Sequence, residues 1–463
     1  MAWRRTAVFL IIAISYLLTN YGGVRSPDSE VVFRTGLSLA RRLSFAVERP
    51  LSWRGFGLAR GRDGRLYSIF GPLESIVLAP LIRIGDLIIA SGLIRGADIR
   101  PSHYIDQGLA DFIGGRTVEN PEPHRLRFIV SYLYLLIGIL NSIIFYHIAR
   151  RFLTEAGSLF VVTLYSLGTI AWGYSGTLFS EPLMILFILA SFLLIDSRPF
   201  ASGFLLGLAT MTHITGILFL PFFLLYLHLK KGRPLVYGCG AAIPLILLCL
   251  YNHLRFGNPL ETGRGISEYV YSYFVPPGPG LYGLLFSPGK GILIYSPAII
   301  IGLLGWRLLH HKDPILSYCL IGTILLRILF IASRSDWPGG FCLGPRYLLP
   351  LLPFLLLPTG FLFERVSYKA VLLIPAFIFM LQQLYLNLGE IFSFFHIMKF
   401  RLIRSGIDPF QGYPIYLRWD TAPICSILKG KPGPYLLTNP IPFTLMLISL
   451  IIILYSETGQ ENR

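Results

Sequence analysis

The chain has 463 residues, of which 54% are hydrophobic and 14% are charged, and its mean hydropathy is +0.63. This composition is too apolar for an ordinary soluble protein and predicts a multi-spanning membrane protein. The net charge of +16 is spread over short loops between apolar segments. Membrane orientation and anionic lipids explain such a distribution, so we expect no nucleic-acid partner. Five cysteines without paired spacing exclude a disulfide scaffold and offer no zinc pattern.

Ten segments are clear candidates for membrane spans, because a span needs about 20 mostly apolar residues. They are residues 6–24, 127–149, 157–176, 180–196, 234–253, 290–309, 313–332, 345–363, 369–389 and 440–455. No small-residue cleavage site follows the first of them, so we interpret it as a retained helix and not as a signal peptide.

Two further segments decide the topology. Residues 76–94 carry Arg83 and Asp86 near the centre, and each charge costs about 2.5 to 3.5 kcal/mol in a membrane unless the two pair with each other. We therefore expect a helix that lies in the interface and does not cross. Residues 200–229 are long for one span and short for two, and Thr212-His213 marks a polar break typical of a hairpin tip.

With these two assignments the fold class is an all-α integral membrane protein of about 12 transmembrane helices. The Lys and Arg clusters then lie on the cytoplasmic side of the cell (inner) membrane, as do both termini. The outward segments are a large first extracytoplasmic loop, residues 25–126, and residues 173–180, 252–289, 333–344 and 390–439. The segments rich in Gly, Pro, Trp, Tyr and charge thus meet on one face, where we expect the site.

The first outer loop opens with two carboxylates, Asp28 and Glu30, directly after the first helix. A carboxylate at the headgroup level can act as a general base toward a sugar or lipid hydroxyl. Ser26-Pro27-Asp28-Ser29-Glu30 also has the composition of a helix start, which favours capping. Both interpretations hold if a serine caps the helix while Asp28 reaches the site.

Other polar residues on the outward face have ordinary structural explanations beside functional ones. Turn formation accounts for Asp63, Tyr67 and Glu74, and a helix start for Glu181. His213 has no second ligand at metal spacing, which favours a polar helix contact over a metal site.

Basic residues on the same face suit an anion. Lys290 precedes a helix, where an ammonium lies beside free backbone N–H groups, although snorkelling gives the same pattern. Arg346 lies one residue inside an apolar helix, and an intramembrane Arg is costly enough to indicate a role such as a bidentate grip on phosphate. The remaining candidates lie in the same motifs and are Asn252, Arg255, Glu261 and Trp337.

Taken in order, these motifs resemble a known family. They are Asp28 and residues 63–72, 176–182, 251–263, 284–291 and 337–348. The set resembles the bacterial GT-C superfamily of membrane glycosyltransferases, which depend on polyprenyl-phosphate sugars. The superfamily includes protein mannosyltransferases and lipid A aminoarabinose and galacturonic acid transferases. The match predicts a GT-C-like catalytic module over 1–365, followed by C-terminal helices over 366–463.

The resemblance implies an inverting sugar transfer from a polyprenyl-phosphate donor, with Asp28 as the base. The family often shows an Asp-Glu or Asp-Gly pair, whereas here Ser29 intervenes and Glu30 becomes the second candidate. Lys290, Arg346 and Arg255 take the phosphate-holding role. Some relatives bind a divalent cation, so a cation is possible, but no metal ligands stand out in this sequence.

The implied partners are a polyprenyl-phosphate-linked sugar, membrane lipid and an acceptor of unknown identity. A multi-spanning lipid or sugar transporter or flippase is the main alternative without catalysis, because charged residues facing a cavity also suit transport. The nearest enzymatic alternative is a ligase or polymerase of surface glycans.

Overall fold

The structure is a computed structural model. It describes residues 2–20, 24, 26–48, 55–92, 124–267, 272–340, 342–388, 406, 413–419, 422–428, 448 and 452. The predicted span 440–455 and most of the predicted outer loop 390–439 lie outside the described residues.

Helices dominate the described part of the chain, as the apolar segments predict. The N-terminal half contains α1 (Ala2–Leu18), α2 (Pro27–Arg42), α3 (Pro72–Ala90), α5 (His124–Ala149), α6 (Glu155–Leu167), α7 (Ala171–Tyr174), α8 (Ser180–Leu194), α9 (Pro199–Thr212), the 3-10 helix η1 (Ile214–Phe219) and α10 (Leu220–Leu229). The remainder contains α11 (Pro234–Phe256), α12 (Pro277–Phe286), α13 (Ile292–Tyr295), α14 (Ile299–Lys312), α15 (Pro314–Ala332), the 3-10 helix η2 (Arg346–Leu351), α16 (Leu352–Arg365), α17 (Ala370–Leu388), α19 (Tyr413–Tyr416) and α20 (Pro423–Leu428).

Five described helices are long and apolar enough to cross a membrane by length and composition. They are Leu126–Ala149, Pro234–Phe256, Pro314–Ala332, Arg346–Arg365 and Ala370–Leu388. Shorter apolar helices pack between them, and α3 is not among the five. The integral membrane class is confirmed, while the count of about 12 spans stays a prediction.

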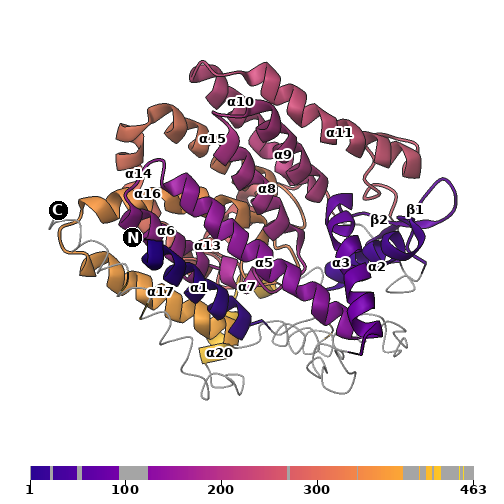
Figure 1. The fold of residues 1–463 in the computed structure, drawn as a ribbon, viewed down its shortest axis with the longest axis horizontal. Coiled ribbons are helices and arrows are strands. Elements are labelled where there is room, and N and C mark those ends of the chain that lie inside the picture. The colour runs from indigo at the N-terminus through magenta and orange to yellow at the C-terminus, as the bar shows by residue number, and fades with distance from the viewer. Residues whose placement is uncertain are drawn as a thin grey trace.

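The helix α2 begins where the sequence predicts a helix start. The Ser26 side chain accepts the backbone N–H of Ser29 at 3.1 Å, and Pro27 occupies the first turn. Its apolar face packs against α3, where the Ser75 hydroxyl donates to the carbonyl of Val32 at 3.0 Å. Together with a small hairpin, α2 and α3 stand at one side of the helical bundle (Figure 1).

The two charges within α3 do not pair with each other, although their spacing would allow it. Asp86 accepts hydrogen bonds from Arg41 of α2, at 2.8 and 3.1 Å, while Arg83 is exposed. The reason is that α2 lies alongside α3 and presents an arginine fork to the carboxylate, a better geometry than two neighbouring side chains on one helix.

The hairpin consists of β1 (Leu58–Arg60) and β2 (Leu66–Ser68), paired antiparallel with Ala59 opposite Tyr67. Its turn contains Asp63 and Gly64, and Gly64 has a φ of +79°, a conformation that glycine adopts without strain. The turn predicted at this point is therefore confirmed. The Arg62 N–H donates to the carbonyl of Arg255 at 2.8 Å, which ties the hairpin to the end of α11.

The region 200–229 forms two helical legs that run in opposite directions. The first leg, α9, lies parallel to α11, since Gly203 approaches Tyr237 and Gly207 approaches Pro244. Because α11 starts beside the start of α9, the segment between them must return the chain to that level. The second leg, η1 followed by α10, therefore reverses direction at His213, as the hairpin prediction requires.

Glu30 is completely buried beneath α2. Its carboxylate accepts from Arg127 at 2.6 and 3.0 Å and from Arg34 at 2.9 Å. Burial alone would raise the pKa of Glu30, but Arg127 and Arg34 together outweigh it and lower that pKa below its usual value. The carboxylate thus joins α2 to the start of α5.

We expect Glu30→Gln to lower the free energy of unfolding by about 3 to 5 kcal/mol, because it leaves the buried Arg127 without its charge partner. Thermal unfolding of the purified protein in detergent measures the change. Asp86→Asn is the matched control, since its ion pair is partly exposed and is worth less than about 1 kcal/mol. Equal midpoints for the two variants would contradict the structural role of Glu30.

Candidate active site

The ends of several helices bring polar residues to one face of the bundle. The helix α8 begins at this face, at Ser180, and runs to the opposite end of the bundle, where Ser191 and Ser202 are in contact beside the short connection to α9. The helix α9 then runs back and ends at this face, next to His213. After His213, η1 and α10 run away from this face, and α11 runs back to it and brings Asn252 there. Alternating helix direction therefore gathers residues from distant parts of the sequence.

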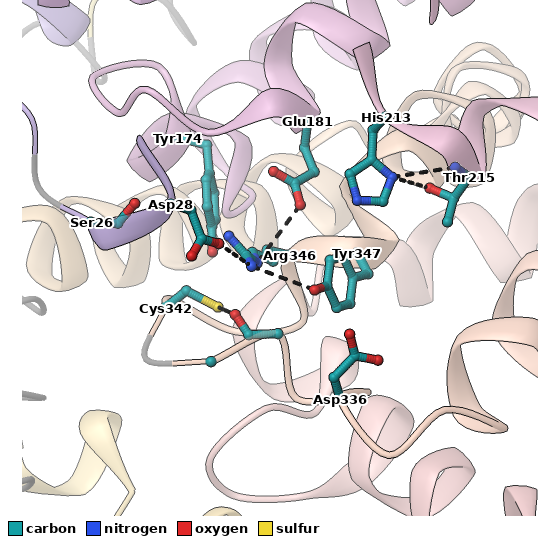
Figure 2. A network of polar contacts seen from close by, with 12 residues as sticks. Ser26, Asp28, Tyr174, Glu181, His213, Thr215, Asp336, Cys342, Arg346 and Tyr347 are labelled. Carbon is teal, nitrogen blue, oxygen red and sulfur yellow. Dashed lines mark hydrogen bonds and ion pairs between the residues drawn. The ribbon is translucent and has the colours of Figure 1, made fainter. Parts of the chain in front are cut away.

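The centre of this face is an ion pair between Asp28 and Arg346. A terminal nitrogen (Nη2) of Arg346 lies 2.8 Å from Oδ2 of Asp28, and Nε of Arg346 lies 3.7 Å from Oε1 of Glu181 (Figure 2). The Asp28 side chain is 25% exposed, whereas those of Arg346 and Glu181 are 8% and 1% exposed. Asp28 is therefore the carboxylate of this group that a substrate can reach.

Aromatic rings and a histidine complete the surroundings of Arg346. Its guanidinium lies 4.5 Å from the ring centre of Phe179 and 5.0 Å from that of Tyr347. The His213 ring lies 6.0 Å from that of Tyr347, and its Nδ1 is 2.7 Å from the hydroxyl of Thr215. Nδ1 also accepts the backbone N–H of Thr215 at 3.3 Å, so the proton of a neutral imidazole resides on Nε2.

Glu74 is a second buried carboxyl group, in the first turn of α3. The hydroxyl of Tyr134 donates to it, and the residue is 2% exposed. Burial raises the pKa of Glu74 from 4.5 to about 8; the hydrogen bond from Tyr134 opposes the shift and the charges of Glu181 and Asp28 add to it. Glu74 is therefore mostly protonated at neutral pH, and its burial leaves Asp28 as the reachable carboxyl group.

Asp336 follows α15 and forms an ion pair with Arg334. Arg334 donates to both carboxylate oxygens, at 2.8 and 2.7 Å, and Arg264 lies 3.9 Å from Oδ2. Burial would raise the pKa of Asp336, but the hydrogen bonds and charge of Arg334 outweigh burial and lower it. This pair fixes the loop that leads to Arg346.

Lys290 is fully buried and donates to that same loop. Its ammonium lies 2.7 Å from each of the carbonyl oxygens of Gly340 and Cys342, and 3.1 Å from Sγ of Cys342. A role in phosphate binding would require Lys290 to give up these bonds. Trp337, in the same loop, packs closely over Gly283 of α12.

Arg255 lies on the inner side of the hairpin, at the end of α11. It donates to the carbonyl of Ser68 at 2.6 Å and to the side-chain oxygen of Asn252 at 2.8 Å. Asn252 in turn donates to the carbonyl of Pro259 at 3.1 Å. Both residues therefore hold the outer loop in place as well as lining the space beside it.

A small cavity, open to solvent, lies beside Arg255, between the hairpin, α9 and α11. Basic and hydroxyl side chains share its wall with apolar ones, and none of its described lining residues is acidic. The polar lining residues are Ser180, Thr210, Thr212, His213, Asn252, Arg255, Thr262 and Arg264. Such a wall suits an anionic group attached to an apolar chain.

Three sequence candidates, Asp63, Tyr67 and Glu261, lie in or beside turns of the outer loops. Asp63 accepts from the hydroxyl of Tyr67 at 2.7 Å, and this hydrogen bond is the main cause of the lowered pKa of Asp63. Glu261 accepts the backbone N–H groups of Gly263 and Gly265, at 2.6 and 3.1 Å. These contacts are those of turn formation, and they do not bring the three residues to the Asp28–Arg346 pair.

Within the described ranges, no three His, Cys, Asp or Glu side chains are grouped so that they could hold a metal ion. The carboxylates nearest Arg346 are engaged by an arginine or a tyrosine. The possible divalent cation therefore stays a prediction to which we assign no ligands and no chemical step.

Sequence reasoning missed Arg127, Arg264 and Arg327. Arg127 begins an apolar helix and Arg264 follows a glycine in a loop, and neither position carries a distinctive local signal. Arg327 stands inside the apolar run 320–332, where the cost of an intramembrane charge, applied above to Arg346, indicates a role in the same way.

Comparison with protein-family models and with curated proteins found no match. Among solved structures, the Archaeoglobus fulgidus oligosaccharyltransferase tethered with an acceptor peptide is 11% identical, with a TM-score of 0.51 over 93% of this chain. The chain shares that protein's fold. It spans 56% of the length of the oligosaccharyltransferase. This likeness confirms the predicted all-α membrane fold.

Two structures of ArnT from Cupriavidus metallidurans also match, each at 13% identity. The apo structure has a TM-score of 0.47 over 92% of this chain and 77% of ArnT. The structure bound to undecaprenyl phosphate has a TM-score of 0.48 over 97% and 78%.

The raised pKa of Glu74 predicts a pH-dependent stability. Between pH 4.5 and about 8 the unfolded chain loses this proton and the folded chain keeps it, so stability falls as pH rises through that window. In Glu74→Gln the side chain stays neutral, so we expect the free energy of unfolding of this variant to fall less steeply with pH. By pH 8 it should exceed that of the wild type by a few kcal/mol more than at pH 5. Thermal midpoints of both proteins from pH 5 to pH 8 measure this, and parallel curves would refute the assignment.

Proposed function

We propose that the protein is an inverting glycosyltransferase. It moves a sugar from a polyprenyl-phosphate donor to a hydroxyl of a lipid, glycan or protein acceptor on the extracytoplasmic face of the inner membrane. The observation that carries this proposal is the reachable carboxylate of Asp28, held by Arg346 at the face where the helix ends meet. The fold shared with an oligosaccharyltransferase supports sugar transfer as the class of reaction.

Asp28 acts as the general base. The acceptor oxygen attacks the anomeric carbon, its proton passes to Asp28, and the bond between that carbon and the phosphate oxygen breaks with its electron pair leaving on the polyprenyl phosphate. A single base is sufficient for this inversion, unlike the two carboxylates of a glycosidase. Glu30 cannot replace Asp28 without leaving Arg127, which makes it the weaker candidate.

In-line displacement places the base and the leaving phosphate on opposite sides of the sugar. Arg346 contacts Asp28, and in Figure 2 His213 lies on the other side of Arg346 from Asp28. His213 and Arg264 line the cavity described above, which has no acidic lining residue among those described. We therefore place the donor phosphate in this cavity.

In this arrangement the sugar lies over Arg346. Arg346 is close enough to Asp28 to orient it, and it faces the bond that breaks, where a guanidinium stabilises developing negative charge. Arg255 contributes to the same positive wall from the end of α11. Lys290 supports the loop before Arg346, so its predicted phosphate contact is the least favoured of the three.

We expect Asp28→Asn to lower transfer by about 100- to 10,000-fold, the range for loss of a general base, while membrane insertion and protein level stay unchanged. Extraction of lipid-linked sugars and of modified glycans from cells that carry the variant in place of the wild type measures donor accumulation and product loss. Asp86→Asn changes a partly exposed carboxylate on α3, and this control is expected to retain activity. Full transfer by Asp28→Asn would exclude the proposed base, and no change in lipid-linked sugars on deletion would favour a transporter or a structural role.

Arg264→Gln tests the phosphate position. Loss of one charge-assisted hydrogen bond, worth about 1.5 to 3 kcal/mol, predicts a 10- to 150-fold rise in the donor KM with a smaller change in kcat. Assays with a synthetic polyprenyl-phosphate sugar measure both constants. Arg62→Gln, an exposed arginine on the hairpin, is the matched control. A donor KM that is unaltered in Arg264→Gln would move the phosphate away from the cavity.

A further inference from the structure

Arg327 is a fully buried cation in the C-terminal third of a spanning helix. It belongs to α15, one of the five helices apolar and long enough to cross a membrane, and its relative exposure is 0%. An arginine at the centre of such a helix costs about 2.5 to 3.5 kcal/mol on an insertion scale, and the cost is smaller, but still unfavourable, toward the helix end where Arg327 lies. A leucine would fill the same volume at no such cost, so packing alone does not account for Arg327.

The guanidinium of Arg327 joins the two 3-10 helices that begin at the site. Its Nε donates to the carbonyl of Tyr347 at 2.8 Å, and its Nη1 donates to the carbonyl of Thr215 at 3.0 Å. Tyr347 follows Arg346 at the start of η2, and Thr215 lies two residues after His213 in η1. One side chain thus spans two segments that are remote in the sequence.

The same guanidinium interacts electrostatically with Glu181, at the start of α8. Nη2 of Arg327 and Oε2 of Glu181 are both buried and have no hydrogen-bond partner among the described residues. Glu181 in turn lies beside Arg346. Arg327 therefore interacts with three segments that carry site residues, η1, η2 and the start of α8. Its positive charge lies on the interior side of Glu181 and balances the charge of that carboxylate.

We infer that Arg327 is a positioning residue for sugar transfer, which sets the relative placement of His213 and Arg346 through the backbone carbonyls beside them. This inference rests on the proposed function, since it assigns a consequence to the reaction. It differs from a role in packing because loss of Arg327 shifts two reacting segments while the folded bundle persists. Short 3-10 helices suit this control, because their hydrogen bonds are weaker than those of α-helices.

The experiment compares Arg327→Met and Arg327→Lys with Ser317→Ala in the full-length protein, purified in lipid nanodiscs. Ser317 is a buried residue of α15 that accepts from the indole of Trp306 at 3.0 Å, away from the site. It controls for general loss of a polar contact in α15. Transfer is measured per folded molecule with a synthetic polyprenyl-phosphate sugar, and amide hydrogen exchange is measured by mass spectrometry without substrate.

We expect Arg327→Met to lower kcat about 100-fold, the effect of a misplacement of about 1 Å, with a smaller change in the donor KM. Amide exchange should rise in the segments that contain η1 and η2 and stay unchanged in α12. Arg327→Lys keeps a charge and one or two donors, so we expect it to restore kcat to within about tenfold of the wild type. Ser317→Ala should leave kcat and the exchange of η1 and η2 as they are.

An unchanged kcat per folded molecule in Arg327→Met, or unchanged exchange in η1 and η2, would overturn the inference and leave Arg327 a packing residue. If Arg327→Met yields no folded protein, Arg327→Gln, which keeps an N–H donor but loses the charge, takes its place: a lower kcat with faster exchange in both segments supports positioning, and wild-type values of either overturn it. Absence of transfer by the wild type would refute the proposed function instead, and the exchange data, which need no substrate, would still decide whether Arg327 holds η1 and η2.

Discussion

The site depends on the ion pair between Asp28 and Arg346, two residues 318 positions apart. A buried guanidinium requires a nearby anion or several acceptors, and here Asp28 and Glu181 supply the negative charge. The pair forms because α2 lies across the face at which η2 and α8 begin. It couples the proposed base, Asp28, to Arg346, so the position of each side chain depends on the other.

The remaining buried cations show how the fold separates structural charges from reactive ones. Lys290 and Arg255 direct their donors to backbone carbonyls, and Arg127 pairs with the buried Glu30. Each of these contacts satisfies donors that water cannot reach. Arg346, in contrast, donates to a carboxylate that is partly exposed, so it stands directly beside the group that a substrate can reach. This contact explains why Arg346, and not Lys290, is central to the proposed mechanism.

Sequence reasoning was most successful where a local rule applies. Ser26 caps α2 while Asp28 reaches the site, so the two interpretations of this segment hold together, and the polar break at His213 does reverse the chain. It did not identify partners that come from other helices: Asp86 pairs with Arg41, and Arg127, one of the two partners of Glu30, is 97 residues away. No local pattern identifies such partners, because apolar helices of similar composition can pack in many orders.

The sequence by itself determined the membrane class, the two legs of 200–229 and the face on which polar motifs gather, because these follow from hydropathy, helix signals and loop charge. Only the tertiary structure decided which carboxylate is reachable and which cations are already satisfied. Asp28 and Glu30 stand two residues apart on one helix, so their local sequences are nearly equivalent. Packing against α5 encloses Glu30 with Arg127, while Asp28 stays 25% exposed beside Arg346.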